Sequence, residues 1–91
     1  MPALDTMVSS MKARVYVSLK PTVLDPQGQT IRSALNGLGH KSITEVRQGK
    51  YFDIAVERDA PREKTIQEIE TIAHEVLSNP VIEEYRVEII D

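Results

Sequence analysis

The sequence predicts an α+β fold in which two helices cover one face of a four-stranded antiparallel sheet. Four stretches alternate apolar and polar side chains, as half-buried strands do, and two repeat apolar side chains at helical spacing. A weak internal repeat at an offset of 39 residues supports two similar halves, because Val15-Tyr16-Val17 falls on Ile54-Ala55-Val56. The predicted order is β-α-β-β-α-β, which is the ferredoxin-like order.

The first predicted half is a strand followed by a helix. Apolar side chains alternate with polar ones over residues 13–20, and Pro21 ends this strand. Asp25-Pro26 predicts a helix start, because Asp caps free amides and Pro at the first helical position loses no hydrogen bond. Gly37 and Gly39 predict its end. The apolar stripe of this helix is Ile31, Ala34, Leu35 and Leu38.

The second predicted half begins with a hairpin. Ile43–Gln48 reads as a weak edge strand, Gly49-Lys50 as the turn, and residues 51–57 as a third strand that pairs back on the second. Asp59-Ala60-Pro61 opens a second helix to about Ser78, and Asn79-Pro80 leads into a C-terminal strand that ends at Ile90. Its inward residues are Val81, Tyr85, Val87 and Ile89. The second helix carries the stripe Ile66, Ile69, Ile72, Ala73, Val76 and Leu77.

Composition predicts a single small domain over residues 12–91, preceded by a flexible extension, residues 1–11. The chain lacks cysteine, so no disulfide or thiolate site is expected, which fits a cytoplasmic protein. Seven Lys/Arg and four Asp/Glu lie in residues 1–56, against four and ten in residues 57–91. The net charge of −3 argues against nucleic acid as a partner, and no apolar run is long enough for a membrane span.

One face of the predicted sheet remains without a helix. A mixed face of this kind either meets water or packs on another copy, and the small aliphatic core favours a homo-oligomer. The residues expected on this face, among charged neighbours, are Tyr16, Ser18, Tyr51, Ala55, Ile82 and Ile90.

No self-sufficient active site is expected. The sequence predicts no catalytic residue, no cofactor-binding residue and no metal ligand in this chain. His40 and His74 do not have metal-ligand spacing, and neither Gly28 nor Gly37-Leu38-Gly39 forms a phosphate-binding loop. The candidate functional cluster is the basic tip Arg47-Gln48-Gly49-Lys50-Tyr51, which reads either as a docking site or as an ordinary turn.

Four motifs in order make the sequence similar to one family. They are Val15–Lys20 (VYVSLK), Val23–Gly28 (VLDPQG), Val46–Tyr51 (VRQGKY) and Asn79–Tyr85 (NPVIEEY). Together they resemble PurS, the small subunit of bacterial phosphoribosylformylglycinamidine synthase, over residues 11–91.

The resemblance implies a non-catalytic bridging subunit in purine biosynthesis. In that family a glutaminase subunit (PurQ) releases ammonia, a large synthetase subunit (PurL) binds ATP and Mg²⁺, and the small subunit joins them and supports ammonia transfer. The small subunit is expected as a homodimer or a dimer of dimers, and as part of an enzyme only within the complex. The resemblance does not assign side chains to partners. We expect Arg47, Gly49, Lys50 and Tyr51 of this chain to contact the large subunit, with Asn79 and Tyr85 shaping the end of the sheet.

A second hypothesis from another functional class is a small-molecule-sensing regulatory domain of the ACT type, which has the same topology and also dimerises. Such a domain needs a Gly-containing ligand loop after the first strand, close to a dimer interface. Gly28 is the one candidate for that loop, and it lies after Pro26 at the start of a helix.

Overall fold

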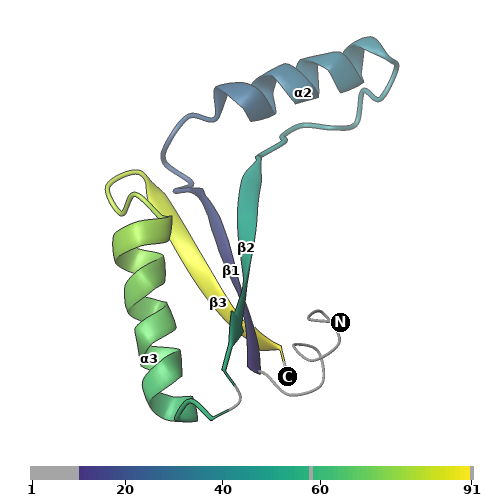
Figure 1. Ribbon diagram of the computed structural model, residues 1–91. Coiled ribbons are helices and arrows are strands. Elements are labelled where there is room, and N and C mark those ends of the chain that lie inside the picture. Colours follow the sequence, from purple (N-terminus) through teal and green to yellow (C-terminus); the bar gives the residue numbers. More distant parts are fainter. Residues whose placement is uncertain (1–10, 58, 91) are drawn as a thin grey trace.

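A computed structural model describes residues 11–57 and 59–90, and this part of the chain forms a three-stranded sheet with two helices (Figure 1). The central strand is β1, which pairs antiparallel with both of its neighbours in the order β2-β1-β3. The α+β class is therefore confirmed. The elements are β1 (Met11–Leu19), α2 (Pro26–Gly37), β2 (Gly49–Val56), α3 (Arg62–Ile72), the π-helical turn η1 (Ala73–Leu77) that continues α3, and β3 (Glu83–Ile90).

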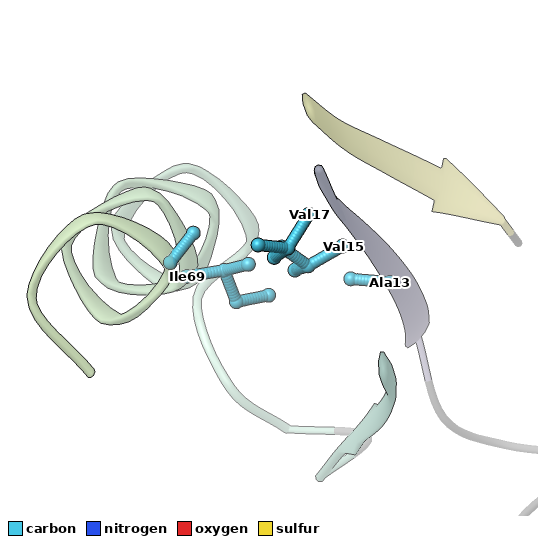
Figure 2. Packing of buried hydrophobic residues seen from close by; sticks show 5 residues of the cluster. Ala13, Val15, Val17 and Ile69 are labelled. Carbon is cyan, nitrogen blue, oxygen red and sulfur yellow. The ribbon is translucent and has the colours of Figure 1, made fainter. Parts of the chain in front are cut away.

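The core lies between β1 and α3. Three side chains of β1 point toward Ile69 of α3, as Figure 2 shows, and the exposed fraction of Ile69 is 2%. The inward side chains of β2 and β3 are only half-buried, because one helix covers the middle of the sheet and not its flanks. The inward residues of β1 are Ala13, Val15 and Val17. The alternation predicted for all three strands is confirmed.

Within the described residues the predicted strand Ile43–Gln48 does not form, and neither does the hairpin at Gly49-Lys50. At the start of this segment the Asn36 side-chain amide of α2 donates to the Ile43 carbonyl at 3.2 Å, and at its end the Gln48 amide donates to the Asp25 carboxylate at 2.7 Å. Gly49 is instead the first residue of β2 and lies opposite Ser18 of β1. The described residues thus contain three strands of the four that were predicted.

Helix α2 forms where predicted, but it does not cover the sheet of its own chain. Figure 1 shows α2 beyond the end of the sheet, whereas α3 runs alongside it. Leu38 is 77% exposed and Ile31 is 40% exposed, so the apolar stripe of α2 is largely uncovered by the rest of residues 11–57 and 59–90. The Cα radius of gyration of 17.3 Å exceeds the roughly 12 Å expected of a compact chain of this length.

The C-terminal strand is shorter than predicted, because Asn79-Pro80 forms a turn before it. The Asn79 side-chain oxygen accepts from the Val81 amide at 3.1 Å, and the Asn79 carbonyl accepts from the amides of Ile82 and Glu83. Val81 and Ile82 therefore lie outside β3 and are exposed.

The predicted flexible extension comprises residues 1–11. Met11 is the first residue of β1, and residues 1–10 lie outside the described residues. None of the helices within residues 11–57 and 59–90 has the length and apolarity needed to cross a membrane.

Candidate functional site

The first surface of interest is the joint, defined here as Asp25, Gly28, Arg47 and Gln48, where the chain enters α2 and later returns to the sheet. Asp25 is the N-cap of α2, and its carboxylate accepts from the amide of Gly28 at 2.9 Å and from that of Gln48 at 2.7 Å. One buried side chain thus caps a helix and also ties down the residue just before β2. The hydrogen bond from the Gln48 amide, and to a lesser extent that from the Gly28 amide, holds the pKa of the Asp25 carboxyl below its ordinary value of 3.8. Burial acts in the opposite direction and raises this pKa.

Arg47 and Gln48 strengthen the joint from the other side. The Arg47 guanidinium donates to the carbonyls of Lys20 at 3.0 Å and Val23 at 2.7 Å, which closes the loop after β1. The Gln48 side chain donates to that of Gln27 at 2.6 Å. The joint fixes the direction in which α2 leaves the sheet, and this explains why α2 does not fold back onto it.

Gly28 marks the closest approach of the two segments within the joint. It is buried, and a Cβ at this position would overlap the Val46 carbonyl oxygen. Glycine is therefore required for the segments to touch.

A cleft of about 250 Å³ opens beside the joint at the same end of the sheet. The start of β2 lines one side of it and the start of β3 the other, so the topology brings Gly49 and Lys50 close to Glu83. Apart from these three residues, the lining consists of Val17, Ser18, Leu19, Asp25, Gln27 and Gln48.

The predicted interface residues at the start of β2 do not form one cluster. Arg47 is occupied by backbone carbonyls, and a Cβ at Gly49 would lie 2.9 Å from the Val17 carbonyl oxygen. Lys50 and Tyr51 are both exposed, but on opposite faces: Lys50 lies on the helix side near Phe52, and Tyr51 on the other side opposite Tyr16. Consecutive strand residues point to opposite faces, so this separation follows from β2 beginning at Gly49.

The other two predicted residues belong to the opposite edge of the sheet. Asn79 holds the turn before β3. Tyr85 is half-buried on the helix side, with its ring 6.1 Å from that of His74. Both side chains thus make contacts within the chain.

The second surface is the open face of the sheet, opposite α3, which the register of the strands defines. Arg14 lies 4.5 Å above the Tyr51 ring, and its guanidinium contacts the Asp53 carboxylate at 2.7 and 3.2 Å. This pairing raises the pKa of Arg14 and lowers that of Asp53. The open face consists of Lys12, Arg14, Tyr16 and Ser18 of β1, Tyr51, Asp53 and Ala55 of β2, and Glu84, Arg86, Glu88 and Ile90 of β3.

Sequence reasoning found part of these surfaces. Tyr16, Ser18, Tyr51, Ala55 and Ile90 lie on the open face as predicted, while Ile82 precedes β3. The arginine–tyrosine stacks were missed, because they depend on the register between strands. Asp25 was predicted only as a helix cap. Its proximity to Gln48, 23 residues away, has no local signal in the sequence.

No group of three or more His, Cys, Asp or Glu residues in the described ranges could hold a metal ion.

Comparison with known proteins identifies the family. The sequence model described as PurS, phosphoribosylformylglycinamidine (FGAM) synthase, matches residues 12–91. The chain belongs to the PurS family. A family member from Synechocystis sp., named phosphoribosylformylglycinamidine synthase subunit PurS, is 42% identical over 89 residues, which is 97% of this chain and 87% of that protein.

Two solved PurS-family structures are also similar to the chain. The crystal structure of Methanocaldococcus jannaschii PurS, one of the subunits of formylglycinamide ribonucleotide amidotransferase, is 40% identical with a TM-score of 0.78 and covers 89% of this chain and 96% of that chain. A chain in the structure of PurLQS from Thermotoga maritima is 30% identical with a TM-score of 0.79, covering 91% of this chain and all of that one. The chain is thus similar in fold to these two structures over about nine-tenths of its length.

Proposed function

We propose that this chain is the non-catalytic bridging subunit of phosphoribosylformylglycinamidine synthase, which joins the glutaminase subunit to the ATP-dependent synthetase subunit. The observation that carries the proposal is the match of 91% of this chain to the full length of a chain in the PurLQS structure. Family membership over residues 12–91 supports it independently. Within such a complex the chain supports transfer of ammonia, ATP and Mg²⁺ bind the large subunit, and the assembly works in the cytoplasm.

The same proposal includes a homodimer, or a dimer of dimers, that exchanges α2. The apolar stripe of α2 is largely uncovered by the part of its own chain that the structure describes, and the inward side chains of β2 are only half-buried. Burial of apolar surface favours placing the first on the second, in another copy. Such an exchange would give each sheet two covering helices, and the segment 43–48 that follows α2 would add the fourth strand of the ferredoxin-like layer.

The six interface residues divide into two proposed roles. Lys50 and Tyr51, exposed on opposite faces of β2, would contact the large subunit. The other four would hold the surface in shape through the internal contacts described above. These are Arg47, Gly49, Asn79 and Tyr85.

The alternative of an ACT-type sensor has less support. It needs space for a ligand beside a glycine after the first strand. Gly28 is buried against the Val46 carbonyl inside the joint, where not even a Cβ fits.

Reconstitution tests the proposed function. Purified glutaminase and synthetase subunits are assayed for glutamine-dependent synthesis with and without this chain. We expect glutamine-dependent activity to require the chain, which alone has none. Lys50→Ala and Tyr51→Ala should raise the concentration of chain needed for half-maximal activity, whereas Lys64→Ala, on the exposed side of α3, should not. Equal activity of the two partners without the chain would contradict the proposal.

A further inference from the structure

Two arginines stack on tyrosines across the open face, and they differ in one respect. Arg14 lies over Tyr51 and also binds the Asp53 carboxylate through two nitrogens. Arg86 lies 4.2 Å above the ring of Tyr16, but no carboxylate within residues 11–57 and 59–90 pairs with it. The same stack therefore occurs once with an anion and once without.

The Arg86 guanidinium is held ready for an anion. Tyr16 beneath it is anchored by its own hydroxyl, which donates to the Glu88 carboxylate at 3.0 Å. Stacking on a fixed ring removes part of the side-chain entropy that an arginine otherwise loses on binding. Its N–H donors form a planar fork that matches the two oxygens of a carboxylate.

A small hollow lies beside this stack. Its volume is about 170 Å³, below the roughly 300–1,000 Å³ of pockets for drug-sized ligands. A single protein side chain suits a space of this size. The hollow is lined by Tyr16, Ser18, Glu84, Tyr85 and Arg86.

We propose that the open face, which carries Tyr51, docks the large synthetase subunit, and that a carboxylate side chain of that subunit pairs with Arg86 above Tyr16. This inference rests on the proposed bridging function. The exchange of α2 would occupy the helix side of the sheet and leave the open face free. Exposed tyrosine and arginine are the residue types enriched at the energetic centre of protein interfaces. The unpaired cation then selects an acidic partner group.

Binding of the chain to the purified glutaminase and synthetase subunits tests this pairing. Arg86→Met keeps an unbranched stem over Tyr16 and removes the charge, so the dissociation constant should rise by at least about 10-fold. Arg86→Lys keeps the charge without the planar fork and should fall between the two. The matched control is Lys64→Met, which changes the net charge equally on the exposed side of α3 and should bind as wild type does.

The mass of the homo-oligomer, measured by light scattering, separates the possible occupants. We expect Arg86→Met to keep the wild-type mass while losing affinity for the synthetase subunit. Unchanged affinity would overturn the proposal, as would a changed mass with unchanged affinity, because the occupant would then be a second copy. The two proposals can fail separately. The proposed bridging function fails if the wild-type chain does not support glutamine-dependent synthesis, whereas the binding data on the Arg86 variants test only the pairing.

Discussion

Helices α2 and α3 both carry an apolar stripe at helical spacing, yet within the described residues only the stripe of α3, continued by η1, supplies buried core side chains. Ile69 of α3 and Ala73 of η1 are buried against β1, with exposed fractions of 2% and 0%, whereas Ile72 and Val76 of the predicted stripe are exposed. On α2, Ile31 and Leu38 remain 40% and 77% exposed. An apolar stripe therefore indicates that a helix has an apolar partner, but it does not indicate which chain supplies that partner.

The connections of the two helices explain the difference. Helix α3 and η1 return to the sheet through the turn at Asn79, which places them along β1 and β3 (Figure 1). Helix α2 is instead held at its start by Asp25 and Gly28, which bind the segment leading into β2. Contacts between distant segments therefore decide where each stripe lies.

The largest expected effect separates the two stripes directly. Ile69→Ala should lower the free energy of unfolding by about 2–5 kcal/mol, because it leaves a cavity in a filled core. Ile31→Ala should act mainly through association, so its effect should depend on protein concentration. Urea unfolding at two protein concentrations, at least 20-fold apart, measures both. If unfolding of the two variants depended on protein concentration to the same extent, this would contradict the inference that another chain covers the stripe of α2.

The next largest effect concerns the joint. Gly28→Ala places a methyl group against the Val46 carbonyl oxygen, and we expect the melting temperature to fall by roughly 5–10 °C. Gly37→Ala is the matched control, because a Cβ there meets no atom within 4 Å and alanine favours the helix. Calorimetry of both variants measures the difference. A Gly28→Ala protein as stable as Gly37→Ala would show that the joint is not tightly packed.

A pH-dependent effect follows from Asp25. Its pKa is held below the ordinary value of 3.8, so its contribution to stability is complete above that value and is lost as the pH falls toward the lowered folded pKa. Asp25→Asn should lower the melting temperature by roughly 4–8 °C at pH 7. The difference in melting temperature between Asp25→Asn and wild type should become smaller below pH 3.8. Glu68→Gln, an exposed carboxylate of α3, serves as control, and a gap independent of pH would contradict this role.

The smallest expected effect lies on the open face. Arg14 and Asp53 are partly exposed, with side chains 32% and 43% accessible, so water and salt screen their attraction. Asp53→Asn should shift the melting temperature by less than about 4 °C, and by less again in high salt. Thermal unfolding at two salt concentrations checks this. A larger loss would mean that the stack of Arg14 on Tyr51 depends on the carboxylate.

Local features of the fold could be read from the sequence, and long-range ones could not. Strand alternation and the cap at Asp25-Pro26 depend on neighbouring residues, and the structure confirms them. The fate of Ile43–Gln48 depends on the closeness of Gly28 to Val46, a contact without a periodic signal. The stack of Arg86 on Tyr16 likewise depends on the register between β1 and β3.

Light scattering on the Ile31→Asp, Leu38→Asp double variant tests whether a second copy of the chain covers the apolar stripe of α2. Both side chains are exposed in the single chain, so the variant should keep its helical circular dichroism and the cooperative unfolding of the α3 core. We predict that it has the mass of a single chain while wild type has that of two or more copies. A folded double variant with the wild-type mass would contradict the claim that a second copy covers the stripe of α2.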